Sequence, residues 1–173
     1  RRFFDIDKLA AIRVELPEVF EATHQLVFRF LAEGKATGLR VDHPDGLWDP
    51  AAYFRQLQQN YAMQRIQPLD DPSLNSNRPL YVVAEKILSK GESLPEDWAV
   101  YGTTGYDFLN QVNGIFVEPA NREAVDKIYR DFLGRKIDFR NLINSTKKMI
   151  MLISMASEVN SLSHQLDRIS ERN

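Results

Sequence analysis

The feature that most limits how this chain can fold is a pair of short apolar runs, each ending at a carboxylate. The first run, 37–41, is followed by Asp42, and the second, 80–84, is followed by Glu85. A helical pattern begins between them at Asp49, since Asp followed by Pro provides an N-cap and a first helical residue. Strand, helix and strand in alternation predict a parallel sheet with right-handed crossovers.

Another helical pattern precedes the first run; it begins at Pro17, and Gly34 is placed to end it. Its apolar face is expected to contain Val19, Phe20, Leu26, Val27, Phe30 and Leu31. In the helix after Asp49, the expected buried residues are Tyr53, Phe54, Leu57 and Tyr61. The second strand is apolar throughout, which is typical of a strand covered on both faces. Residues 67–79, rich in Asp, Pro, Ser and Asn, are predicted to form a loop.

An α/β fold follows for the first two thirds of the chain, although periodicity alone leaves a closed barrel and an open sheet as alternatives. No glycine-rich phosphate loop follows either strand, which disfavours a dinucleotide-binding fold. The net charge of -2 gives no broad attraction for nucleic acid or anionic membranes. The chain has no cysteine, no apolar run long enough to span a bilayer, and no signal-peptide core. These properties predict a cytoplasmic protein.

From Asn121 onwards the pattern predicts helices only. The first of them places Val125, Ile128, Tyr129 and Phe132 on one face and ends at Gly134. The last is predicted as a single helix with an apolar seam at alternating steps of three and four residues. This seam comprises Leu152, Met155, Val159, Leu162, Leu166 and Ile169. It favours either packing within its own domain or association with another chain.

Two carboxyl groups at the C-terminal ends of parallel strands are placed to share one cavity. Retaining glycoside chemistry requires such a pair, one ionised to attack the anomeric carbon and one protonated to assist the leaving oxygen. Arg40 lies two residues before Asp42, so the two side chains point to the same side of the strand. Its guanidinium is expected to keep Asp42 charged. The apolar approach to Glu85 favours its protonated form.

Other interpretations of these residues remain open at this point. An Arg-x-Asp on a strand can be a structural ion pair, and a Glu at a strand end can cap a following helix. A divalent metal site from Asp42, His43 and Asp45 is chemically reasonable, although the intervening Pro44 disturbs the alternation and no further ligand is evident. The other two histidines, His24 and His164, are expected to be structural or solvated.

Two motifs resemble conserved regions of the α-amylase superfamily. Residues 38–42, GLRVD, match the fourth-strand region, in which an Arg-x-Asp carries the nucleophile. Residues 83–86, VAEK, match the fifth-strand region with its acid/base Glu. Ordinary amylases have a small residue after the nucleophile and a Lys-His pair further on. This chain has HPDGL at 43–47 instead, which indicates a different subgroup.

Four stretches in the same order are similar to the maltooligosyltrehalose synthase family. They are 1–5 (RRFFD), 38–50, 83–88 (VAEKIL) and 102–108 (GTTGYDF). The family's third catalytic carboxylate, an Asp preceded by His, has no counterpart, because no His-Asp pair occurs in the chain. The resemblance therefore implies an internal segment with two domains. Residues 1–118 would form the central part of a (β/α)8 TIM barrel, strands four to six, and 119–173 a helical subdomain or insertion.

The resemblance also implies an intramolecular transglycosylase that converts the reducing-end α-1,4 bond of a maltooligosaccharide to an α,α-1,1 bond. The implied catalytic residues are Asp42 as nucleophile, Glu85 as acid/base, and Arg40. The implied substrate-binding residues are His43, Asp45, Lys86 and Tyr106. The partner would be a maltooligosaccharide or α-glucan, with neither cofactor nor metal required.

Two alternatives stay open, one within the same superfamily and one from a different class. One is a hydrolase of the same superfamily, such as an amylase or a trehalose-releasing hydrolase, with the same carboxylates and a wetter acceptor site. The other is a non-catalytic helical interaction module that uses the apolar seam. An isolated segment is expected to lack activity and to self-associate through an exposed sheet edge or the C-terminal helix.

Overall fold

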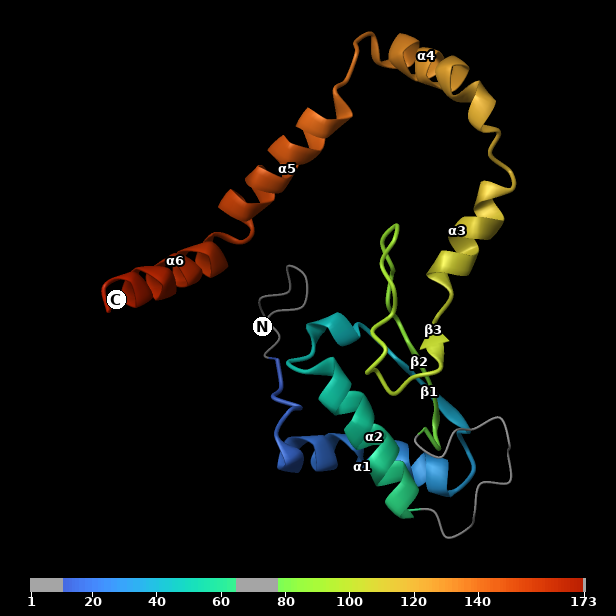
Figure 1. Ribbon diagram of the computed structural model, residues 1–173, viewed down its shortest axis with the longest axis vertical. Coiled ribbons are helices and arrows are strands. Elements are labelled where there is room, and N and C mark those ends of the chain that lie inside the picture. The colour runs from blue at the N-terminus through green and yellow to red at the C-terminus, as the bar shows by residue number, and fades with distance from the viewer. Residues whose placement is uncertain (1–10, 65–77, 173) are drawn as a thin grey trace. The chain divides into compact units, whose positions relative to one another are not determined.

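The computed structural model describes residues 11–64 and 78–172 (Figure 1). It divides into two compact units, Arg1–Phe116 and Val117–Asn173. The helices of the first unit are α1 (Pro17–Ala32), η1 (Pro44–Gly46), α2 (Pro50–Gln64) and α3 (Tyr106–Gly114). Its strands are β1 (Gly38–Val41), β2 (Tyr81–Ala84) and β3 (Gly102–Thr103). Most of the loop predicted at 67–79 lies outside the described residues.

The three strands form a parallel sheet in the order β1-β2-β3. The prediction of a parallel sheet with a helix between successive strands is confirmed for β1, α2 and β2. Their register pairs Arg40 with Val83 and Val41 with Ala84. β3 was not predicted, because a strand of two residues leaves no pattern in the sequence.

Helix α1 begins and ends where the sequence indicates. Pro17 is its first residue, and Gly34 follows its C-cap with a φ of 67°, a left-handed conformation that glycine adopts at little cost. The predicted apolar face is partly wrong, since Leu26 is 51% exposed and Phe30 39%. The buried residues are Phe20, His24, Phe28 and Leu31. Their steps of four and three residues describe one stripe, and hydrophobicity alone did not identify the histidine in it.

His24 is buried because both ring nitrogens have partners. Nδ1 lies 2.8 Å from the carbonyl oxygen of Phe20, and Nε2 lies 2.9 Å from the Tyr53 hydroxyl. The imidazole also stacks on the Phe20 ring at 4.0 Å between centroids. Burial lowers the pKa of His24 and raises the pKa of Tyr53 to about 12. His24 and Tyr53, both uncharged, therefore join α1 to α2.

Helix α2 begins at Pro50, as predicted, with the Asp49 carboxylate accepting a hydrogen bond from the Ala52 amide at 2.8 Å. Its apolar side contributes to the core between the two helices and one face of the sheet. The largest fully buried apolar side chains of this core are Phe20, Phe54, Leu57, Leu80, Val82 and Val100. Tyr53 and Tyr61 are only partly buried.

The prediction that β2 is covered on both faces is wrong for the described residues. Val82 and Ala84 are fully buried, whereas Tyr81 is 49% exposed. In β1, Leu39 and Val41 pack on the core and the alternate residue Arg40 is exposed. The open face thus carries the residues in phase with Arg40 on β1 and with Val83 on β2.

In the second unit, all described elements are helical. They are η2 (Pro119–Asn121), α4 (Arg122–Leu133), α5 (Phe139–Ile153) and α6 (Ala156–Ser170). Gly134, with a φ of 66°, ends α4 as expected. No described helix in either unit has the length and apolar character needed to cross a membrane.

The prediction of a single C-terminal helix is wrong, because the structure has two helices there. The apolar seam is divided between α5, which contains Leu152, and α6, which begins after Met155. The amides of Ser154 and Met155 both donate to the carbonyl oxygen of Ile150, at 2.9 and 3.1 Å. The regular i to i−4 ladder ends there, so the seam is not one continuous stripe. Most of its side chains are exposed, including Leu162, Leu166 and Ile169.

Candidate active site

The candidate site is built at the C-terminal ends of β1 and β2, where one guanidinium joins the two predicted catalytic carboxylates. Arg40 Nη1 lies 2.9 Å from Asp42 Oδ1, and Arg40 Nη2 lies 3.1 Å from Glu85 Oε1. The Glu85 amide also donates to the Val41 carbonyl at 2.8 Å, which extends the ladder to the candidate catalytic positions. Asp42 and Glu85 therefore converge on the same end and the same face of the sheet.

Asp42 is held in its ionised form. Its pKa is lowered first by the hydrogen bond from Arg40 and next by a hydrogen bond with the Glu85 carboxyl. The first cause is the one expected from the Arg-x-Asp spacing, and that expectation is confirmed. The lowered pKa therefore favours the charged carboxylate of Asp42. An attacking carboxylate needs this state.

Glu85 is the most contacted carboxylate of the site. Besides Arg40, its oxygens accept hydrogen bonds from the His43 amide at 3.2 Å and from the Tyr106 hydroxyl at 3.3 Å. Its side chain is 22% exposed, against 60% for Asp42. These donors come from three elements, so the orientation of Glu85 depends on the loops that follow β1 and β3.

His43 begins the loop after β1 in an unusual conformation. Its φ of 41° is left-handed, and it is the only non-glycine residue with positive φ among those described. A Cβ atom added to Gly46 would lie 2.7 Å from Cδ2 of the His43 ring. Gly46 is thus required for the close approach of the ring to η1. The HPDGL sequence supplies this turn, which keeps the His43 amide within hydrogen-bond distance of Glu85.

Tyr106 reaches Glu85 from the start of α3. Gly105 precedes it with a φ of 93°, and the Gly105 amide donates to Thr103 Oγ1 at 3.1 Å. The Thr103 hydroxyl in turn donates to Asp107 Oδ1 at 2.9 Å. This turn redirects the chain from β3 into α3 and places the tyrosine over the end of β2. All three strand ends therefore contribute to the site.

Lys86 and Asp45, both predicted to bind substrate, contact each other. Lys86 Nζ lies 3.0 Å from Asp45 Oδ2 and 2.9 Å from Glu92 Oε1. Glu92 was not singled out in the sequence, because it lies in an irregular loop without a motif. The structure makes it the second partner of the lysine.

The metal interpretation of Asp42, His43 and Asp45 finds no support within residues 11–64 and 78–172. No three His or carboxylate side chains in these ranges are grouped so that they could hold a metal ion. The physical reason is that Asp42 pairs with Arg40, whereas Asp45 turns to Lys86. The two carboxylates therefore form ion pairs with different basic side chains, Asp42 with Arg40 and Asp45 with Lys86.

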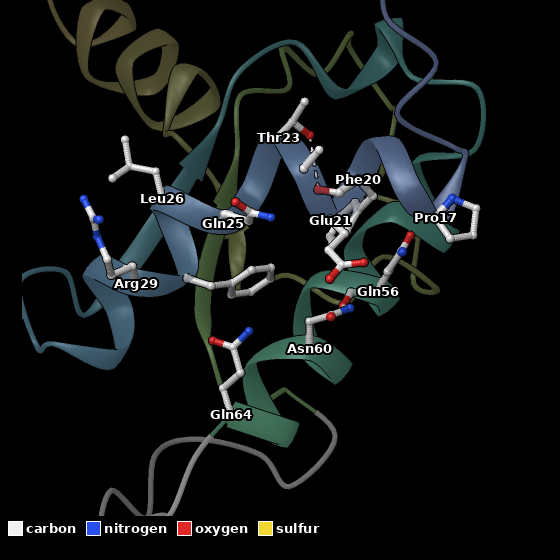
Figure 2. Close-up of a pocket in the computed structure, with 12 residues that line it drawn as sticks. Pro17, Phe20, Glu21, Thr23, Gln25, Leu26, Arg29, Gln56, Asn60 and Gln64 are labelled. Carbon is white, nitrogen blue, oxygen red and sulfur yellow. Dashed lines mark hydrogen bonds between the residues drawn. The ribbon is translucent and has the colours of Figure 1, made fainter.

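A cavity of about 750 Å³ lies away from these residues, in the groove between α1 and α2 (Figure 2). Its polar lining includes Glu21, Gln25, Gln56, Asn60 and Gln64. None of the predicted site residues lines it. The candidate site therefore rests on the convergence of side chains at the strand ends, and this groove has no part in it.

Comparison with known proteins gives an independent result, although no protein-family model matches the chain. Putative maltooligosyl trehalose synthases of Mycobacterium tuberculosis strains CDC 1551 and H37Rv are each 32% identical over 169 residues. The match covers 98% of this chain and 19% of each relative. The solved structure of DSM5389 glycosyltrehalose synthase is 38% identical with a TM-score of 0.79. That of maltooligosyltrehalose synthase from Arthrobacter ramosus is 34% identical with a TM-score of 0.80.

Each structural match covers 96% of this chain and 20% of the other. The agreement in sequence and in fold extends over both units, including the helical region for which the motifs gave little information. The chain is thus similar to proteins named maltooligosyltrehalose synthase and spans about one fifth of their length.

Proposed function

We propose that this chain supplies the nucleophile and the acid/base residue of a maltooligosyltrehalose synthase. The observation that carries the proposal is the bridge from Arg40 to both Asp42 and Glu85 at adjacent parallel strand ends. The resemblance to enzymes of that name, over nearly the whole chain, supports it. Within a longer protein, residues 1–118 would form strands four to six of a (β/α)8 barrel, and 119–173 a helical insertion.

In the first step, an oxygen of Asp42 bonds to the anomeric carbon of the penultimate glucose, and the bond from that carbon to the glycosidic oxygen breaks. Glu85 transfers its proton to the departing oxygen. Arg40 keeps Asp42 ionised before the attack. The products of this half-reaction are a glycosyl ester on Asp42, a Glu85 carboxylate and a free glucose.

In the second step, the released glucose turns so that its anomeric hydroxyl faces the ester. Glu85 removes the proton of that hydroxyl, whose oxygen attacks the same anomeric carbon and displaces Asp42. The result is an α,α-1,1 bond, with both catalytic groups returned to their starting states. Water must be excluded between the steps, because it would hydrolyse the ester to a free sugar.

His43 and Tyr106 are the residues best placed to hold the glucose between the steps. The His43 backbone amide and the Tyr106 hydroxyl already contact Glu85, so both groups lie beside the path of the acceptor. A tyrosine hydroxyl both donates and accepts, and can follow Glu85 as its protonation changes. These contacts favour retention of the glucose over its replacement by water.

Product analysis of the full-length natural protein with maltopentaose tests the proposal. The expected product is a non-reducing isomer of unchanged mass, formed by the unmodified protein and absent with Asp42→Asn. Asp131→Asn is a matched control, because Asp131 is 64% exposed in an ion pair on α4. Accumulation of glucose and maltotetraose would identify a hydrolase of the same superfamily instead. Unchanged activity of Asp42→Asn would refute the nucleophile assignment.

A further inference from the structure

The amine of Lys86 is enclosed between two carboxylates at the rim of the candidate site. Its distances are 3.0 Å to Asp45 Oδ2 and 2.9 Å to Glu92 Oε1. The lysine side chain is only 13% exposed, whereas those of Asp45 and Glu92 are 51% and 37% exposed. The lysine side chain is thus less exposed than either of the carboxylates that it pairs with.

The three residues join two loops that are separate in the sequence. Asp45 lies in η1, in the loop after β1. Lys86 and Glu92 lie in the loop after β2, and Glu92 closes a turn there by accepting a hydrogen bond from the Ser89 amide at 2.9 Å. The loop after β1 is therefore fastened to the loop after β2 through one ammonium group.

This fastening matters because the loop after β1 positions Glu85. The His43 amide donates to Glu85 Oε2 at 3.2 Å, two residues before Asp45, and His43 has a left-handed backbone. A non-glycine residue in that region costs on the order of 1 kcal/mol or more and persists only where its surroundings hold it. The ion pair between Asp45 and Lys86, two residues after His43, is the contact that holds this part of the loop in place.

We propose that Lys86, with Asp45 and Glu92, is a positioning unit that keeps the His43 amide on the acid/base carboxylate. This inference rests on the proposed function and replaces the expected contact of Lys86 and Asp45 with substrate. Two of the three ammonium protons point at protein carboxylates, which leaves little of the group for a sugar hydroxyl. Both carboxylates raise the pKa of Lys86, Glu92 more than Asp45, so the tether stays charged.

The test compares Lys86→Met, Glu92→Gln, their double variant and Lys86→Arg in the full-length protein, with maltopentaose as substrate. Lys127→Met is the matched control, because it removes an exposed Lys–Asp pair on α4. Loosening the His43 amide should lower kcat by about 10-fold or more while KM stays within about 2-fold, since misplaced catalytic groups affect the reacting state most. The double variant should be no worse than Lys86→Met, because both changes break one unit. Lys86→Arg should recover much of kcat.

Each other result has a distinct meaning. A raised KM for Lys86→Met, with Glu92→Gln unaffected, would mean that Lys86 binds substrate and would overturn the inference. A lowered melting temperature with unchanged kcat would reduce the three residues to a structural ion pair and would also overturn it. If the unmodified protein released only glucose and shorter oligosaccharide, the isomerase assignment would fail. The same kcat comparison, made on hydrolysis, would still decide whether the positioning unit exists.

Discussion

Replacement of Gln58 by Leu should destabilise the first unit strongly, because this one side chain fastens α2 to the sheet. Its Nε2 donates to the Leu80 and Ala99 carbonyls, both at 2.9 Å, and its Oε1 accepts from the Leu80 amide at 2.8 Å. The residue is 3% exposed. Leucine has a similar volume, so the change removes polar contacts and leaves little cavity.

The magnitude follows from the groups that lose their partner. One buried N–H and two buried carbonyls lose the Gln58 side-chain amide as their hydrogen-bond partner. An unsatisfied buried group costs about 1–3 kcal/mol. Water reaches some of these groups after relaxation, so we expect a loss of roughly 3–5 kcal/mol in the free energy of unfolding. That is a large part of the roughly 5–15 kcal/mol typical of a domain.

Urea unfolding followed by tryptophan fluorescence measures this effect. Trp98, 7% exposed and adjacent to Ala99, reports on the core, whereas Trp48 is already 74% exposed in the folded chain. Gln59→Leu is the matched control, because Gln59 is the next residue of α2 and is exposed. It should change stability by no more than about 0.5 kcal/mol. A Gln58→Leu variant within about 1 kcal/mol of the unmodified protein would refute the reasoning.

Three further predictions concern other positions. Arg40→Met should move the acid limb of the kcat/KM profile to higher pH, because it removes the main cause that lowers the pKa of Asp42; an unmoved limb would contradict this. Gly38→Ala should cost about 1–3 kcal/mol in thermal unfolding, since its Cβ would lie 2.8 Å from the Tyr81 carbonyl oxygen. Burial lowers the pKa of His24 below its ordinary 6.5, so the unfolded chain gains a proton first and stability should fall as pH drops below 6.5. In His24→Gln that part of the pH dependence, measured by urea unfolding, should disappear.

The sheet and the placement of the two carboxylates could be predicted because their signals are local. Apolar runs of strand length, a helix start at Asp49-Pro50 and a carboxylate after each run determine which ends converge once the strands are parallel. The pKa effect of Arg40 on Asp42 followed from the period of a strand. None of these inferences needed a contact between distant residues.

What the sequence did not reveal depends on tertiary contacts. Glu92 pairs with Lys86 only because an irregular loop folds back, and Gln58 is buried only because two backbone segments converge on it. His24 replaces an apolar residue in the α1 stripe because Tyr53 provides a partner. The C-terminal seam is divided because the helical hydrogen-bond ladder ends at Ser154. The spacing of apolar residues does not reveal such a break.

The central claim, that Asp42 becomes covalently glycosylated while Glu85 serves as acid and base, can be tested directly by trapping the intermediate. In full-length Glu85→Gln protein supplied with α-maltosyl fluoride, the fluoride leaves without protonation, whereas attack on the ester lacks its base. The glycosyl enzyme should therefore accumulate. Mass spectrometry of peptides is expected to find an added maltosyl group, two hexose units, on Asp42 and none in Asp42→Asn/Glu85→Gln. Label on another residue, or steady turnover by the double variant, would contradict the account.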